Sequence, residues 1–228
     1  MKVAVVGATG LVGTRMLEVL AERNFPVTEL IPVASAKSVG RKITFQGKEW
    51  TVVSAEDAIA ARPDLALFSA GGSTSAELAP KFAEVGTRVV DNSSQWRMDP
   101  TKKLVVPEVN GDVIEESDYI IANPNCTTII MAVCLKAIEE LSHIKRVHVS
   151  SYQSASGAGA QAMAELEEQY RQALNGEEVK HQKFAYQLAY NLIPQIDVFG
   201  DDDYTKEELK MYHETRKIMH SDIKVSAT

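Results

Sequence analysis

The sequence predicts an α/β protein with an N-terminal, Rossmann-type doubly wound parallel sheet and a second, α+β substrate or dimerisation domain. Three observations predict it. Short apolar runs typical of buried strands alternate with helical stretches through residues 1–127. A glycine-rich turn joins the first apolar run to the first helical stretch. After residue 127 the pattern changes to fewer strands and a long polar connection, so we expect domains at 1–127 and 128–228.

The elements of the first domain follow in order. Residues 2–7, KVAVVG, read as a buried strand, and Leu11 to Glu22 has helical periodicity. A helical stretch at 75–85 lies between the second and third of four further strands. Those four are expected in ELIPVAS (29–35), DLALFSA (64–70), TRVVDNSS (87–94) and DYIIANP (118–124). Since strands that alternate with helices pair in parallel, helices should cover both faces of one sheet.

The second domain is predicted to contain fewer strands than the first. We expect helices at 127–141, 161–174 and 205–219, and a longer strand within KRVHVSSYQSAS, residues 145–156. DIKVSAT, residues 222–228, resembles a strand that has just begun and has no partner after it. Because this would leave an unpaired edge, we expect the natural polypeptide to continue and the second domain to be incomplete at Thr228.

Composition restricts the class of protein. A net charge of −7 argues against a general nucleic-acid binder, which usually presents a basic face. Two cysteines make a disulfide framework unexpected and suit a reducing compartment. The N-terminus lacks a signal-peptide pattern, and the longest uncharged apolar run, Ile129 to Leu135, is too short to cross a bilayer. We therefore expect a cytoplasmic protein with neither nucleic-acid nor membrane partners.

The glycine-rich turn indicates nucleotide binding. VVGATGLVG places Gly7, Gly10 and Gly13 directly after the first strand and into the first helix. Glycines at such a turn let the backbone approach a pyrophosphate, whose charge is stabilised at a helix N-terminus. A purely structural tight turn is the alternative.

The end of the second strand favours NADP over NAD. An NAD site usually has an acidic residue there, which binds the ribose 2′-hydroxyl. This chain instead has VASAKSVGRK, with Ser35, Lys37 and Ser38, and its Glu29 lies at the wrong end of the strand. Hydroxyls and cations suit a 2′-phosphate, although a solvated basic loop would look the same.

Cys126 stands where an extended segment, ANPN, gives way to a helix. A thiol in the first turn of a helix meets backbone N–H groups without partners and the positive end of the helix dipole, and both favour the thiolate. Beside a nicotinamide, such a thiolate suits thioester chemistry between an aldehyde and an acyl phosphate. Cys126 could also be a small buried side chain in a turn. Cys134, in an apolar helical run, is expected in the core.

Taken together, six segments in matching order resemble aspartate-semialdehyde dehydrogenases. They are VGATGLVG, FSAGGSTS, VVDNSSQWRM, VPEVN, NPNCTT and YQSASGAG. The stretch LIPQIDVFGDDDYTKEELKMYHETRKIM matches the same family further on, so the resemblance spans essentially the whole chain.

The resemblance implies roles for individual residues. Cys126 matches the acyl-accepting nucleophile, and Gln153 the residue that orients the substrate. Arg97 and Lys217 match phosphate contacts, and Glu214 matches a contact to the substrate amine. The cofactor contacts implied by the turn and by the resemblance are Gly7, Thr9, Gly10, Leu11, Val12, Gly13, Ser35, Lys37, Ser38, Ser69, Gly71, Ser156 and Gly157, with Gly72 nearby. Each has a structural alternative: surface cations, strand or helix pairing, or close packing of glycines.

The resemblance also implies an activity. It is the NADP-dependent conversion of aspartyl phosphate into aspartate semialdehyde and phosphate, in lysine, diaminopimelate, threonine and methionine biosynthesis, by a homodimer or homotetramer without a metal. The family's catalytic histidine and a second substrate arginine follow a pattern like VSAT, so none of the five histidines here is assigned as the base. This chain alone is therefore expected to be weak or inactive. The alternatives are a catalytically dead NADP-binding module and, less favoured, an N-acetyl-glutamyl-phosphate reductase.

Overall fold

A computed structural model describes all residues from Met1 to Thr228, in two compact units. The first unit contains Met1–Ile144 and His213–Ile223, and the second contains Lys145–Tyr212 and Lys224–Thr228. Each unit is described by itself below. The predicted domain boundary at residue 127 stays a prediction.

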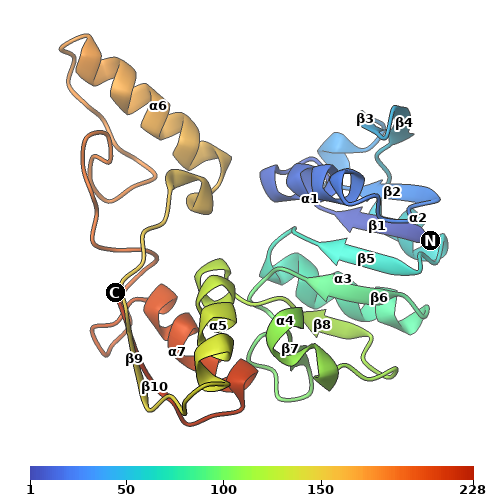
Figure 1. The fold of residues 1–228 in the computed structure, drawn as a ribbon. Helices are drawn as coiled ribbons and strands as arrows, with labels where there is room; N and C mark the ends of the chain where they lie inside the picture. The colour runs from blue at the N-terminus through green and yellow to red at the C-terminus, as the bar shows by residue number, and fades with distance from the viewer. The chain divides into compact units, whose positions relative to one another are not determined.

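The first unit is built on a six-stranded, wholly parallel sheet in the order β2-β1-β5-β6-β8-β7 (Figure 1). Its strands are β1 (Lys2–Val6), β2 (Glu29–Val33), β5 (Leu65–Phe68), β6 (Arg88–Asp91), β7 (Lys103–Leu104) and β8 (Ile120–Ala122). The strand order reverses direction at β1, since β2 lies on one side of it and β5 on the other. Ligands of doubly wound sheets bind at the carboxyl ends of the strands beside such a reversal. The predicted fold class is confirmed.

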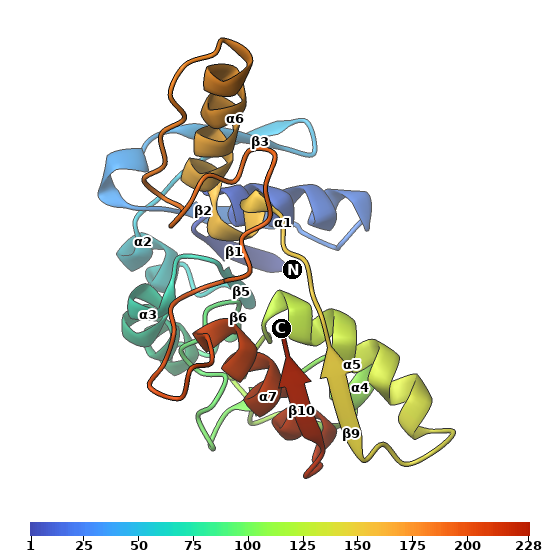
Figure 2. The same cartoon turned by 90° about the vertical axis from the view of Figure 1, so that its left-hand side faces the viewer.

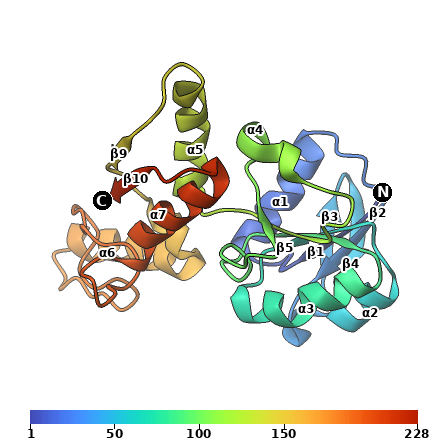
Figure 3. The ribbon, with the colours of Figure 1, turned by 90° about the horizontal axis from the view of Figure 1, so that it is seen from below.

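Helices cover both faces of this sheet. They are α1 (Leu11–Glu22), α2 (Ala55–Ala60), α3 (Gly72–Glu84), α4 (Pro107–Asn110) and α5 (Cys126–Glu139). Two short 3-10 helices lie in connections between these elements: η1 (Ala36–Ser38) after β2, and η2 (Gly111–Val113) after α4. Figure 3 shows α1 on one face of the sheet and α2 and α3 on the other.

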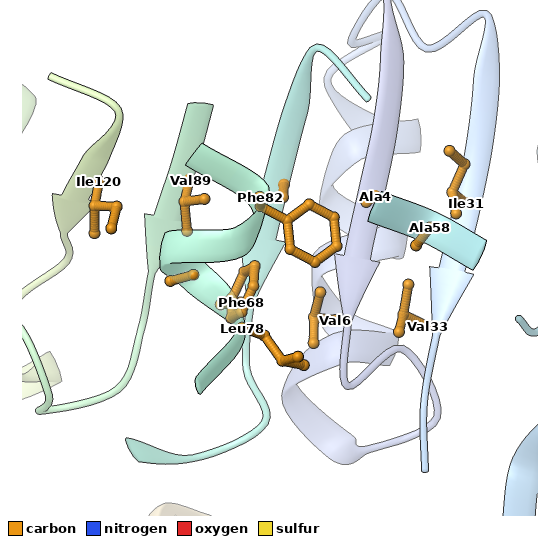
Figure 4. Close-up of a cluster of buried hydrophobic side chains, with 12 residues drawn as sticks. Ala4, Val6, Ile31, Val33, Ala58, Phe68, Leu78, Phe82, Val89 and Ile120 are labelled. Carbon is orange, nitrogen blue, oxygen red and sulfur yellow. The ribbon is translucent and has the colours of Figure 1, made fainter. Parts of the chain in front are cut away.

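The strand β1 shows why its sequence is apolar throughout. Val3 and Val5 point toward the cluster that contains Leu17 and Leu20 of α1. Ala4 and Val6 point the other way, into the cluster around Phe68 and Phe82 (Figure 4). Phe68 of β5 and Phe82 of α3 meet edge to face, with ring centroids 5.5 Å apart. A strand buried on both faces has no polar side, so it does not alternate.

Several short elements of the first unit were not predicted. The antiparallel hairpin of β3 (Lys42–Phe45) and β4 (Lys48–Thr51) turns at Gln46 and Gly47, both with positive φ. Such φ values define the tight turns that fit the twist of a hairpin. The strand β7 at the sheet edge and the helices α2 and α4 were also missed, because two, six and four residues are too few to show a period.

The second unit carries β9 (Arg146–Val149), η3 (Ala155–Ala158), α6 (Ala160–Leu174) and β10 (Lys224–Ala227). The strand predicted over 145–156 is thus shorter than expected. The strand expected in DIKVSAT forms as β10, which pairs in parallel with β9, a strand earlier in the chain, and the two lie side by side in Figure 2. Helix α7 (Lys206–Met219) begins in the second unit and ends in the first. No helix of the structure has the length and apolarity that a bilayer crossing needs.

The loop between α6 and α7 is attached to α6 by two side chains, one helical turn apart. The carboxylate of Glu165 accepts hydrogen bonds from the backbone N–H groups of residues 182–184. The amide oxygen of Gln169 accepts from the N–H groups of Leu188 and Ala189 at 2.8 and 2.9 Å. Gln169 is fully buried. These bonds give an otherwise irregular segment a fixed course.

Candidate active site

The glycine turn after β1 lies at the edge of the sheet where a dinucleotide is expected. Gly7 has a φ of 91°, and its N–H donates to the carbonyl of Val33 at 2.8 Å. A Cβ on Gly13 would lie 2.1 Å from the carbonyl oxygen of Gly7, so α1 packs directly on the turn. This contact requires glycine at position 13 and brings the first N–H groups of α1 to the carboxyl end of β1.

Residues of the turn itself face solvent. Thr9, Gly10, Leu11 and Val12 are all exposed, and Gly10 is the N-cap of α1. Its lack of a side chain leaves the first turn of α1 without a side-chain cap, and that turn contains no acidic residue. The first N–H groups of a helix have no intrahelical acceptor. An anion can therefore reach them.

The loop that follows β5 lies against the same turn. A Cβ on Gly7 would meet the backbone oxygen and Oγ of Ser69, each at 2.9 Å. The N–H of Ser69 donates to the carbonyl of Val6 at 2.8 Å. Gly71 has a φ of 87° and is the N-cap of α3. Two of the predicted cofactor segments are thus neighbours at the point where the strand order reverses.

The predicted 2′-phosphate segment follows the end of β2. Ser35 is the N-cap of the 3-10 helix η1, which contains Lys37 and Ser38. Ser35 and Lys37 are exposed. The same segment continues past the positive-φ Gly40 into the hairpin. A cation and hydroxyl groups are therefore accessible at the carboxyl end of β2.

Cys126 is the first residue of α5, and its thiol is exposed. The preceding residue, Asn125, caps the helix: its side-chain oxygen accepts from the N–H groups of Thr127 and Thr128, at 3.0 and 3.3 Å. The sequence therefore placed Cys126 correctly at the helix entrance. Asn125 itself was missed as a site residue, although an asparagine before a helical run is a recognised cap signal.

A buried ion pair lies directly behind this helix entrance. Arg97 Nη1 donates to Glu214 Oε1 at 3.0 Å, and the two side chains are 10% and 2% exposed. Glu214 Oε2 accepts the backbone N–H of Asn125 at 2.6 Å. Arg97 also donates through Nε to the carbonyl of Asn123 and through Nη2 to that of Asn92. The structure thus brings together three residues that the resemblance had singled out: Arg97, Cys126 and Glu214.

Lys217, one turn beyond Glu214 on α7, joins the same cluster. Its Nζ donates to the carbonyl oxygens of Arg97 and Asp99 at 2.8 and 2.7 Å. Burial lowers the pKa of Lys217, and the nearby charge of Asp99 only partly opposes this effect. The ammonium of Lys217 is therefore bound to the same short segment, residues 97–99, that carries the guanidinium of Arg97.

Three predicted residues lie in the second unit. Gln153 precedes η3, which contains Ser156 and Gly157. A Cβ on Gly157 would lie 2.4 Å from the Cδ and Nε2 atoms of Gln153. The Gln153 side chain is therefore folded over the backbone of Gly157, and glycine leaves the space that it fills.

The prediction for Cys134 was wrong, because this cysteine is exposed. The buried face of α5 consists of Thr128, Met131, Ala132 and Leu135. Cys134 lies on another face, with exposed apolar neighbours Ile130, Val133 and Ile138. A helix that is apolar on most sides gives no indication of which face is covered.

Comparisons with known proteins show the family to which the chain belongs. Residues 2–117 match the family model described as semialdehyde dehydrogenase, NAD binding domain, and residues 135–228 match the semialdehyde dehydrogenase dimerisation domain. An aspartate-semialdehyde dehydrogenase of Aquifex aeolicus is 56% identical over 232 residues, which cover 100% of this chain and 68% of that protein. The chain belongs to the aspartate-semialdehyde dehydrogenase family.

Solved structures of the family have the same fold. A crystal structure of aspartate semialdehyde dehydrogenase II from Vibrio cholerae superposes with a TM-score of 0.96 at 49% identity, covering 100% of this chain and 69% of that one. The same enzyme complexed with ASA gives 0.95 at 49% identity, covering 99% and 68%. The family supports an oxidoreductase of this type that acts in the aspartate pathway of amino-acid biosynthesis. The matched second domain model supports an oligomer.

Proposed function

We propose that this chain carries the NADP-dependent reaction of its family, in which L-aspartyl 4-phosphate and aspartate 4-semialdehyde interconvert through a thioester on Cys126. The observation that carries the proposal is an exposed thiol at the first position of α5, backed by the Arg97–Glu214 pair. The relatives named above supply the substrate class.

The residues of this chain perform the acyl-transfer half of the reaction. The Sγ atom of Cys126 attacks the carbonyl carbon of the acyl phosphate, the bond from that carbon to the phosphate oxygen breaks, and phosphate leaves with the electron pair. The acyl group remains on Sγ as a thioester. In the opposite direction, phosphate attacks the thioester and Cys126 is released as a thiolate. When bound, the nicotinamide exchanges a hydride with the acyl carbon.

Arg97 and Lys217 are proposed to bind the transferred phosphate. A guanidinium has five N–H donors and an ammonium three. Arg97 uses three in its bonds to Asn92, Asn123 and Glu214, and Lys217 uses two. Both cations therefore keep donors for a phosphate oxygen while they are held in place. Gln153 is proposed to orient the substrate, and Glu214 to contact its amine.

A dinucleotide site is proposed at the turn that follows β1. The exposed Thr9–Val12 segment, the uncapped start of α1 and the Gly7–Ser69 contact form a backbone surface at the sheet's reversal point. The pyrophosphate would lie at the N-terminus of α1. Ser69, Gly71, Ser156 and Gly157 are further proposed contacts.

NADP rather than NAD is proposed because of the segment after β2. Lys37 is exposed there between Ser35 and Ser38, and no acidic residue follows β2 before the hairpin. A carboxylate would repel a 2′-phosphate, whereas an ammonium and two hydroxyls attract it. A homodimer or homotetramer in the cytoplasm is proposed with it.

The test is phosphate-dependent formation of NADPH from aspartate semialdehyde by the 228-residue chain, with Cys126→Ala as the matched variant. Turnover that needs both phosphate and Cys126 supports the proposal. Because this chain alone is expected to be weak or inactive, the assay is repeated on a protein in which the part of the Aquifex aeolicus relative that this chain does not cover is joined after residue 228. An NADP-binding module without catalysis predicts NADPH binding without turnover in both proteins, with or without Cys126→Ala. If the chain uses NAD as well as it uses NADP, the proposal that NADP is the cofactor is wrong. If NADP is the cofactor, Lys37→Glu should reduce the preference for NADP over NAD.

A further inference from the structure

Glu214 reaches from α7 to the backbone immediately before the nucleophile. It is 1% exposed, and its Oε2 accepts the N–H of Asn125 at 2.6 Å, across 89 residues of sequence. The N–H of a helix cap has no acceptor within its own helix. A carboxylate is a strong acceptor for such a group, because the bond is charge-assisted.

Asn125 links this bond to Cys126. Its backbone N–H is held by Glu214, while its side-chain oxygen holds the N–H groups of Thr127 and Thr128. Cys126 is the single residue between the anchored cap and the capped turn. Movement of Asn125 would therefore displace the Sγ atom of Cys126 from its place at the first position of α5.

Arg97 neutralises the negative charge of Glu214 beside Cys126. A buried carboxylate this close to Cys126 would oppose a negative charge on its sulfur. Arg97 Nη1 pairs with the other oxygen of Glu214 at 3.0 Å, so the anchor carries little net charge. Arg97 Nε also donates to the carbonyl of Asn123 at 3.0 Å. The segment from Asn123 to Asn125 is thus held at both ends by one ion pair.

We propose that Glu214 is a positioning residue for Cys126, acting through the backbone N–H of Asn125 with Arg97 as its counter-ion. The inference rests on the proposed function and adds a second role to Glu214, besides the substrate contact that the resemblance implies. The two roles differ in what they change. A substrate contact sets KM, whereas a positioning residue sets the reactivity of the thiol and the rate of acyl transfer.

The experiment uses Glu214→Gln, which keeps the shape of the side chain and removes its charge. Glu139→Gln is the matched control. Glu139 lies at the other end of α5, and its Oε2 accepts the N–H of Ile144 at 2.7 Å. All chains carry Cys134→Ser, because both cysteines are exposed and only Cys126 should react. The readouts are the rate of Cys126 alkylation by iodoacetamide, kcat and KM for aspartate semialdehyde, and the melting temperature.

Glu214→Gln is expected to lower kcat by about tenfold, the loss of roughly one charge-assisted bond, with KM changed less than about threefold. It should also change the rate of alkylation by at least about threefold, because Cys126 loses its fixed position and Arg97 loses its counter-charge. Glu139→Gln should leave both rates within about twofold. A raised KM with unchanged alkylation and kcat would overturn the positioning role and leave a substrate contact. Absence of NADPH formation by the parent chain, which is expected to be weak or inactive by itself, would not affect the test of the positioning role, because alkylation measures the thiol directly.

A measurement on the unsubstituted chain covers the case in which Glu214→Gln does not fold. The amide hydrogen of Asn125 should exchange with solvent at least about a hundredfold more slowly than an exposed loop amide, since it is buried and bonded. Exchange at the rate of an exposed loop amide would show that the bond to Glu214 does not persist, and the inference would be wrong.

Discussion

Replacing Gly13 by alanine is expected to damage the stability of the first unit and its capacity to bind a dinucleotide. The added Cβ would lie 2.1 Å from the carbonyl oxygen of Gly7 and 2.8 Å from the Cα of Ala8. Ordinary carbon–oxygen contacts begin near about 3.3 Å, so the turn must move by about 1 Å. These are backbone atoms, so no side-chain rotation relieves the contact.

The cost follows from what the turn holds. The N–H groups of Gly7 and Ala8 donate to the carbonyl of Val33 at 2.8 and 3.0 Å, and that of Gly10 to Gly7 at 2.9 Å. Overpacking costs about 1–3 kcal/mol and each weakened hydrogen bond about 1 kcal/mol. A total near 3 kcal/mol corresponds to a melting temperature lower by about 6–12 °C in a chain of this size. The affinity for NADPH should fall by at least about tenfold.

The assay is thermal unfolding followed by circular dichroism, together with titration of NADPH. Gly111→Ala is the matched control, because a Cβ there would meet only Pro107 at 3.9 Å and the backbone φ is −61°. That control should melt at the parent's temperature or slightly higher. A Gly13→Ala chain that melts within about 2 °C of the parent and binds NADPH equally would refute the close packing of α1 on the turn.

Three further predictions concern other residues. Gly157→Ala should displace the side chain of Gln153, which lies 2.4 Å from the new Cβ, and lower kcat/KM by about tenfold or more with little change in melting temperature. Burial raises the pKa of Glu165, but the N–H groups of residues 182–184 outweigh it and hold the pKa low. The charged form of Glu165 therefore adds stability at neutral pH, and this stability is lost as the pH falls through the lowered pKa. The free energy of unfolding of Glu165→Gln should accordingly fall less between neutral and acidic pH than that of the parent chain. Burial lowers the pKa of Lys217, so its charge is lost at a lower pH than usual. KM for phosphate should then rise on the alkaline side, and Lys217→Arg should move that rise to higher pH; a pH profile unchanged by the substitution would contradict it.

The local sequence pattern was sufficient to predict most of the fold of the first unit. The continuous apolar run of β1 and the glycine turn after it predicted a parallel, doubly wound sheet, which the structure confirms. The hairpin of β3 and β4 was missed because its strands, KITF and KEWT, are short and mostly exposed, and its turn residues, Gln46 and Gly47, are a less common pair. The exposure of Cys134 could not be predicted, since periodicity shows that a helix has an apolar face but not whether anything covers it.

The site also contains features that adjacent residues predict and features that they do not. Cys126 at a helix entrance follows from adjacent residues, and so does the cap by Asn125. The bonds that hold this entrance do not follow from adjacent residues, because Glu214 is 89 residues from Asn125 and 117 from Arg97. Such pairs obey no local period. The resemblance singled out Arg97 and Glu214, but only the structure shows that they bond to each other and to the backbone beside Cys126.

This double use of side chains changes how substitutions in the cluster should be interpreted. Arg97 and Lys217 bond to backbone carbonyls as well as presenting charge, and Glu214 bonds to a backbone N–H. An alanine at any of them removes the support of the loop together with the proposed ligand contact, and it leaves a buried group unpaired at a cost of about 1–3 kcal/mol. Loss of activity in an alanine variant therefore cannot be assigned to substrate binding alone. Arg97→Lys keeps the charge but not the planar fork that bridges Glu214 and Asn123. If Arg97 acts mainly through phosphate, Arg97→Lys should change KM for phosphate and leave alkylation of Cys126 unchanged. If it acts mainly as the counter-ion of Glu214, alkylation should slow with it.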